Sequence, residues 1–150
     1  MTQAVTLPAP GARSIPRSIG AVFAGFVFVF VTSLGVDQVL HVLHVYPPWG
    51  QPNFDVATNV LPLVYRFLFD AIGAYLVTAL APRNPVRHVW VYAAIGLVIG
   101  TVGAIGAMPL HLGPAWYGIG VAVSAIPASW LGGMLYLRTR ATPAVSPTPA

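Results

Sequence analysis

The chain has 150 residues, of which 57% are hydrophobic and 7% are charged, and its mean hydropathy is +0.77. A soluble domain usually has about a quarter of its residues charged, so this composition excludes one and indicates an integral membrane protein. The seven basic residues are scattered arginines without the basic and aromatic stripe of a nucleic-acid interface, so we expect no nucleic-acid partner. The absence of cysteine excludes disulfides and thiolate chemistry.

Four apolar stretches are each close to the length of about twenty residues that a helix needs to cross the hydrocarbon core. We expect membrane spans over about residues 19–40, 58–80, 88–107 and 115–137. Residues 1–18 contain three prolines and no apolar periodicity, which predicts a flexible cytoplasmic leader. Residues 138–150 are of low complexity and predict a disordered cytoplasmic tail.

The arginines predict the orientation of these spans. Four spans place the N-terminus, the second loop and the C-terminus on one side, and this side carries Arg13, Arg17, Arg83, Arg87, Arg138 and Arg140. Arginine-rich short loops stay on the cytoplasmic side of a membrane. The predicted fold is therefore an all-α, integral membrane four-helix bundle of two antiparallel helical hairpins, with both termini in the cytoplasm.

Small residues recur at helical spacing in the third and fourth spans. Small side chains let helix backbones approach closely, which matters in lipid because there is no hydrophobic force between helices. We expect six of them to pack the helices: Gly96, Gly100, Gly103, Ala125, Ser129 and Gly133. The same residues could instead join copies of the chain in a homo-oligomer.

Polar side chains inside the membrane are expected to form one outward-opening pocket. Asp37 and His41 lie one helical turn apart in the first span, and Arg66 and Asp70 are spaced likewise in the second. A charge at the bilayer centre costs about 2.5–3.5 kcal/mol, so these side chains should face the bundle. Arg66 could pair with Asp37 or with Asp70, and the pair could be a structural tie or a functional site.

The outer side carries further candidate groups. His44 and His111 could add polar or metal contacts to the pocket, but the spacing Asp-x3-His-x2-His is not a specific metal or haem signature, so no metal or cofactor is predicted. A stiff aromatic knob in the first outer loop is expected to anchor the chain at the interface or to dock a partner. Its residues are Tyr46, Pro47, Pro48 and Trp49.

Several motifs together carry a resemblance to a known family. They are Asp-x3-His at residues 37–41, Pro-Pro-Trp-Gly-Gln-Pro at 47–52, Leu-Gly-Pro-x-Trp-Tyr at 112–117, and the shorter runs 65–66, 80–82 and 130–133. Over residues 17–137 the chain resembles an uncharacterised family of small four-helix bacterial inner-membrane proteins. The resemblance implies this topology and a bacterial inner membrane, and it implies no activity.

Two classes of function are favoured after an enzyme is set aside, because no serine has a convincing histidine and acid constellation, and a metal or haem site of histidine and aspartate is a third, less favoured alternative. The sequence favours a non-enzymatic structural or accessory membrane component, alone or with a partner in a membrane complex. The alternative is a small transporter coupled to protons or cations through Asp37 and Asp70. Asp70 distinguishes these two classes of function. A structural component would have a dry, fully paired carboxylate at this position, whereas a carrier would have one that can change protonation.

Overall fold

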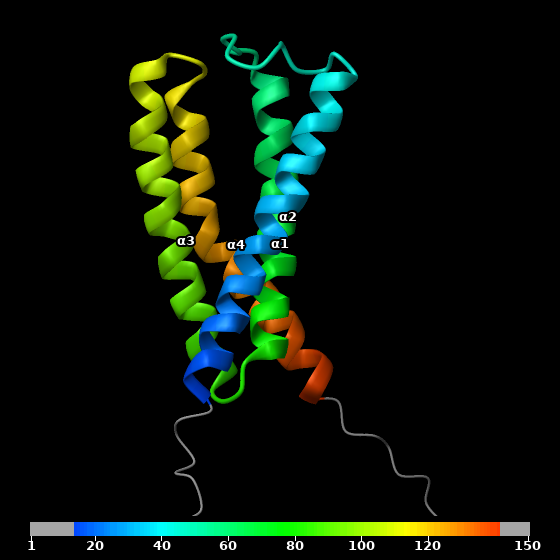
Figure 1. The fold of residues 1–150 in the computed structure, drawn as a ribbon, viewed down its shortest axis with the longest axis vertical. Coiled ribbons are helices and arrows are strands. Elements are labelled where there is room, and N and C mark those ends of the chain that lie inside the picture. Colours follow the sequence, from blue (N-terminus) through cyan, green and yellow to red (C-terminus); the bar gives the residue numbers. More distant parts are fainter. Residues whose placement is uncertain (1–13, 142–150) are drawn as a thin grey trace, which may run out of the picture.

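The computed structural model describes residues 14–141, which form four long helices and one short 3-10 helix (Figure 1). Their bounds are α1 Ser14–Val42, α2 Val56–Leu80, α3 Pro85–Ala107, η1 Met108–Leu110 and α4 Ala115–Ala141. All four long helices are long and apolar enough to cross a membrane. The described residues contain no strand, and the expected all-α, four-helix membrane fold is confirmed.

The first and last helices of the chain extend beyond the expected spans. Residues 14–18, which we expected in the leader, form the first turns of α1, and a helix tolerates Pro16 there because the first N–H groups need no partner within the helix. Residues 138–141, which we expected in the tail, continue α4. The rest of the expected leader and tail, residues 1–13 and 142–150, lies outside the described part of the chain.

An aspartate cap sets the start of α2. The carboxylate of Asp55 accepts a hydrogen bond from the backbone N–H of Thr58 at 2.9 Å. This bond lowers the pKa of the exposed Asp55 side chain, which keeps it ionised at neutral pH beside the positive end of the helix dipole. The helix therefore begins at Val56, two residues before the expected span.

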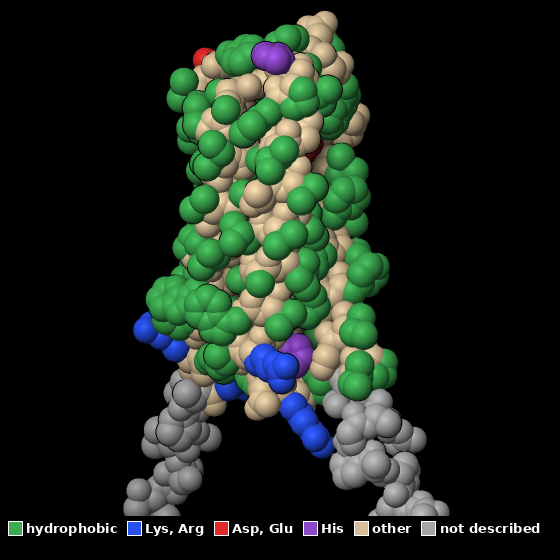
Figure 2. All heavy atoms as spheres, turned by 90° about the vertical axis from the view of Figure 1, so that its left-hand side faces the viewer, with side chains coloured by type: hydrophobic (Ala, Val, Ile, Leu, Met, Phe, Trp, Pro, Cys, Tyr) green, Lys and Arg blue, Asp and Glu red, His purple; other side chains and the backbone are tan. Residues whose placement is uncertain are grey.

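The helices run antiparallel, so the start of α1, the turn between α2 and α3, and the end of α4 lie at one end (Figure 1). We call it the arginine end, since it carries Arg17, Arg83, Arg87, Arg138 and Arg140. The opposite end, with loops 43–55 and 108–114, is the loop end. On the face drawn in Figure 2, the arginine side chains gather at the arginine end, and hydrophobic side chains cover most of the length above them.

α2 and α4 hold the two hairpins together. α1 packs along α2, α3 packs along α4, and α2 packs along α4, whereas the backbones of α1 and α3 come close at only a few positions. At the closest approach, Gly132 of α4 lies against the carbonyl oxygen of Ala71 in α2, with no room for a Cβ. A glycine at this crossing is needed because a side chain would push the two central helices apart.

Five of the six expected packing residues lie at or near helix contacts. Gly96 faces Ala125 across the α3–α4 contact, Gly133 faces Val89, and Ser129 is fully buried.

Gly100 also lies against α4, where an added Cβ would come 2.9 Å from the Cα of Ala122, and further along Gly118 of α4 lies against Ala104. Gly103 differs, because nothing lies within 4 Å of a Cβ added there and the residue lines a cavity instead. The α3 contact row follows a spacing of four residues through positions 96, 100 and 104, and Gly103 lies off this row.

Gly132→Ala should destabilise the protein, because the new Cβ would overlap the Ala71 carbonyl and overpacking typically costs about 1–3 kcal/mol. Gly103→Ala is the matched control, since it adds the same atom in open space and should leave stability unchanged or raise it by up to about 1 kcal/mol. Thermal unfolding of the detergent-solubilised variants measures both effects. Equal stability of the two variants would contradict the α2–α4 contact.

Candidate functional site

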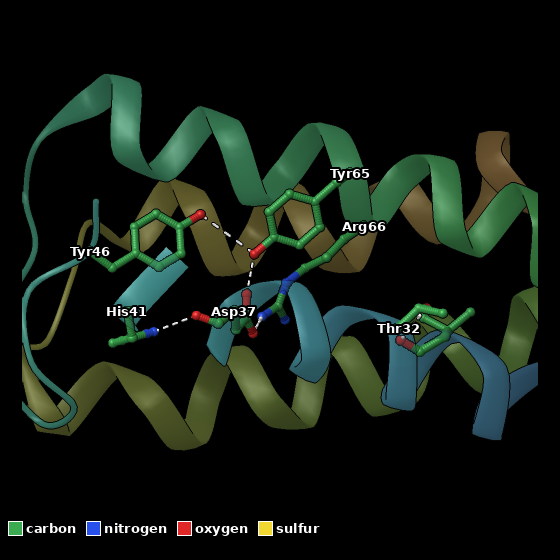
Figure 3. Close-up of polar contacts among 7 residues, drawn as sticks. Thr32, Asp37, His41, Tyr46, Tyr65 and Arg66 are labelled. Carbon is green, nitrogen blue, oxygen red and sulfur yellow. Dashed lines mark hydrogen bonds and ion pairs between the residues drawn. The ribbon is translucent and has the colours of Figure 1, made fainter. Parts of the chain in front are cut away.

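Asp37 of α1 and Arg66 of α2 form an ion pair within the membrane-spanning helices (Figure 3). Nη2 of Arg66 donates to Oδ2 of Asp37 at 2.5 Å, and the hydroxyl of Tyr65 donates to Oδ1. Each oxygen of this buried carboxylate therefore has a donor. Of the two pairings that the sequence left open, the structure contains the one with Asp37.

A chain of hydrogen bonds links this ion pair to the first loop (Figure 3). Tyr65 has one hydroxyl proton and donates it to Asp37, so its oxygen accepts from the hydroxyl of Tyr46, 3.5 Å away. Burial raises the pKa of Tyr46, which lies in the loop beyond the end of α1, and so keeps this donor protonated. Tyr46 from the loop and Tyr65 and Arg66 from α2 are thus aligned on one carboxylate of α1.

His41 lies on the loop side of Asp37 and does not line the cavity expected to contain it. Its Nδ1 donates to the backbone carbonyl of Asp37 at 2.7 Å, and its ring stacks on Trp49 with ring centroids 3.8 Å apart. The edge of Tyr46 completes this aromatic cluster, with ring centroids 5.4 Å apart. His41 therefore supports the loop above the ion pair.

The expected outer-loop knob is divided between the interior and the surface. Tyr46 is buried and turned towards Tyr65, whereas Pro48 and Trp49 are exposed and Pro47 is partly so. The cause is the end of α1, where the N–H of Val45 bonds to the carbonyl of Leu40 and the chain folds back over the helix.

His44 and His111 lie at helix ends and do not join Asp37. Both have a left-handed backbone, with φ of 57° and 49°, and His44 makes the reversal that ends α1. Nδ1 of His111 donates to the carbonyl of Pro109 at 2.9 Å. In residues 14–141, no group of three or more histidine and acidic side chains is arranged to hold a metal ion.

Asp70, one turn further along α2 from Arg66, has different surroundings from Asp37. Its Oδ1 accepts a hydrogen bond from the hydroxyl of Tyr92 in α3 at 2.8 Å. Its Oδ2 is buried without a hydrogen-bond partner in the described part of the chain. Ser129 of α4 lies beside this carboxyl, outside hydrogen-bonding geometry, and its buried hydroxyl is also unpartnered. Asp70 is therefore held by a neutral donor at one oxygen only.

Glycines bring Tyr92 to Asp70. A Cβ on Gly73 of α2 would come 2.7 Å from the hydroxyl oxygen of Tyr92, and one on Gly25 of α1 would come 3.1 Å from its ring. The ring itself is fully buried and packs on Phe26, with centroids 4.4 Å apart. The absence of side chains at these two glycines therefore leaves the space in which the Tyr92 hydroxyl reaches the Asp70 carboxyl.

Two cavities between the hairpins meet at Arg66, which lines both. The loop-side cavity, of about 510 Å³, extends from Gly113 in the loop 108–114 to Arg66. The second cavity, of about 360 Å³, extends from Arg66 towards Phe26 and contains both Asp37 and Asp70. We call it the Asp70 cavity. A solute that enters from the loop end would pass Arg66 before it reaches Asp70.

Unpartnered polar atoms gather at the Asp70 cavity. Within residues 14–141, the buried side-chain atoms without a hydrogen-bond partner are Ser33 Oγ, Arg66 Nε, Asp70 Oδ2 and Ser129 Oγ. Three of these residues line the cavity, and Ser129 lies beside Asp70. Buried polar groups in folded proteins are almost always hydrogen-bonded to protein or water. Their concentration here marks a site that can accommodate a polar ligand or water.

Sequence reasoning missed the two tyrosines that hold the carboxylates. Tyr65 is adjacent to Arg66, but the helical period alone does not place it on the same side of α2. Tyr92 carries a clearer signal, because it lies seven residues after the start of α3 and Asp70 lies ten residues before the end of α2. Across a short turn between antiparallel helices, these positions have similar depths.

Comparisons of the chain with protein families, curated proteins and solved structures find no match.

Arg66→Ala should strongly reduce the yield of folded protein, because it leaves the Asp37 carboxylate buried without its cation, a loss that typically costs about 3–5 kcal/mol. Tyr65→Phe removes one hydrogen bond to a charged group and should cost about 1.5–3 kcal/mol. Replacing both members of the pair, as Asp37→Leu with Arg66→Met, should recover much of the stability. Unchanged melting of Arg66→Ala in detergent would show that the ion pair is not a tie.

Proposed function

We propose that the protein is a small, non-enzymatic membrane carrier in which Asp70 binds a proton or a small cation. The observation that carries this proposal is the state of Asp70 Oδ2, which is buried, unpartnered and located at a cavity between the two hairpins. Ionisable groups inside membrane bundles are costly and commonly mark ion pathways or proton relays. A carboxylate with one bare oxygen is a suitable ligand for a proton or a cation.

The charges around the cavity favour a cation over an anion. The Asp37 carboxylate and the Arg66 guanidinium neutralise each other at 2.5 Å, so the ionised form of Asp70 gives the cavity a net negative charge. Tyr92 contributes a neutral donor and does not cancel this charge. Asp37 is unsuitable for exchange because Arg66 and Tyr65 engage its two oxygens.

Prolines in the two central helices support a change of shape. Pro62 lies inside α2 one turn before Arg66, and Pro127 lies inside α4 two residues before Ser129. Each proline removes a backbone hydrogen bond and permits a bend in its helix. Bending at these points would change the opening between the hairpins on the loop side of Asp70, as alternating access requires.

We further propose that the arginine end faces the cytoplasm of a bacterium and that the helices cross its inner membrane. Five described arginines at this end support the orientation through the positive-inside rule. The motif resemblance to bacterial inner-membrane proteins supports the location. In this orientation the loop-side cavity lies on the outer side of the membrane.

A structural or accessory role is the second candidate. The observation in its favour is the tie of Asp37 to Arg66 and Tyr65, which needs no exchange of ligand, and the exposed Trp49 in the outer loop offers a contact for a partner. The two candidates differ at Asp70, because a purely structural protein gains nothing from a buried carboxylate oxygen without a donor.

Proton flux in proteoliposomes tests the carrier. The purified protein is reconstituted into liposomes that enclose a pH-sensitive dye, and gradients of Na⁺, K⁺ and a small amine are applied across the membrane in turn. We expect flux driven by at least one of these cations, and we expect Asp70→Asn to reduce it to the level of empty liposomes. Asp55→Asn is the matched control, since it makes the same change at the exposed cap of α2, where asparagine caps equally well.

A folded Asp70→Asn variant with unchanged flux would contradict the assignment of Asp70. Absence of flux with every cation in the folded wild-type protein would instead favour the structural candidate.

A further inference from the structure

A third cavity lies away from Asp70, between α1 and α3 at the arginine end. Its volume is about 660 Å³, larger than either cavity at the Asp70 site. Its apolar walls come from the first turns of α1, with Ile19 and Phe23, and from α3, with Val91 and Ile95. The groove exists because the backbones of α1 and α3 come close at only a few positions.

The groove is apolar along the helices and basic at one end. Ile19 and Phe23 are about two-thirds exposed, at 65% and 67%, so the apolar part faces the surrounding hydrocarbon. Arg83 and Arg87 line the end that lies at the membrane boundary. An apolar surface that runs into the bilayer from a basic rim is complementary to a phospholipid, with its acyl chain along the apolar part and its anionic headgroup at the rim.

The charge at the rim is positive. The described residues at the arginine end include no aspartate or glutamate, since Asp37, Asp55 and Asp70 belong to the other half of α1, to the first loop and to the middle of α2. Both helices that border the groove also begin at this end, so their dipoles add positive potential. The groove therefore complements a phosphate at its rim.

We propose that this groove binds one anionic phospholipid, with its phosphate at Arg83 and Arg87 and an acyl chain between α1 and α3. Basic pockets between membrane helices on the cytoplasmic side are known to hold such headgroups. A free phosphate ion would leave the apolar walls unused. A second copy of the chain would bring another arginine end to the rim, and like charges oppose that contact.

Native mass spectrometry of the full chain in detergent tests the proposal with phosphatidylglycerol and phosphatidylcholine of identical acyl chains. We expect one phosphatidylglycerol to be retained in preference to phosphatidylcholine. Arg87→Gln should weaken that binding roughly fivefold, the usual effect of one arginine near an anionic lipid surface. Arg140→Gln is the matched control, because it removes one arginine from the same end, on α4 and outside the groove.

A groove-filling variant, Ile95→Trp, should weaken the binding of both lipids. Equal retention of the two lipids, or equal losses in Arg87→Gln and Arg140→Gln, would overturn the proposal. Competition by inorganic phosphate at equal concentration would show a free-anion site, and a lipid-independent dimer broken by Ile95→Trp would show that a second copy covers the groove. Asp70→Asn should keep the lipid preference, so this result is separable from the outcome of the transport test.

Discussion

A charge inside the hydrocarbon region must find its partner within the bundle, and the arrangement of this protein depends on that constraint. Arg66 finds Asp37 across the α1–α2 contact, and Tyr65 completes the donor set of the carboxylate. This tie sets the rotation of α1 against α2 and so places Asp70 towards α3 and α4. At the arginine end, the charges lie beyond the hydrocarbon region, where we propose that they attract anionic lipid.

The two intramembrane carboxylates therefore have different surroundings although they line one cavity. Asp37 is saturated with donors, and its replacement affects the packing of the hairpin. Asp70 has one neutral donor, Tyr92, and one oxygen without a hydrogen-bond partner, and in the proposed carrier this second oxygen would bind the proton or cation. The close glycine contacts of the central helices hold the cavity walls near this oxygen while leaving the space beside Arg66 open.

Hydropathy and arginine placement predicted the four helices, their antiparallel order and the arginine end, because these depend on local composition. The spacing of Arg66 and Asp70 predicted that both face the bundle, but not the choice of Asp37 as partner, which depends on the relative rotation of two helices. Tyr46 was misplaced because the backbone reversal at His44 turns the loop back over α1, and the same loop stacks Trp49 on the ring of His41. Helix spacing carries no information about that reversal.

The most direct test observes the three aspartates separately. The chain has three aspartates and no glutamate, so selective ¹³C labelling gives one side-chain carboxyl signal per site, assigned by replacing each with asparagine. In lipid bilayers, we predict that the Asp70 signal shifts as pH or cation concentration changes, while the Asp37 signal stays fixed when cations are added, because Arg66 and Tyr65 engage its oxygens. Asp55 should shift only in acid, consistent with its lowered pKa. An immobile Asp70 signal, or an Asp37 signal that moves with it, would contradict the division of roles between the two carboxylates.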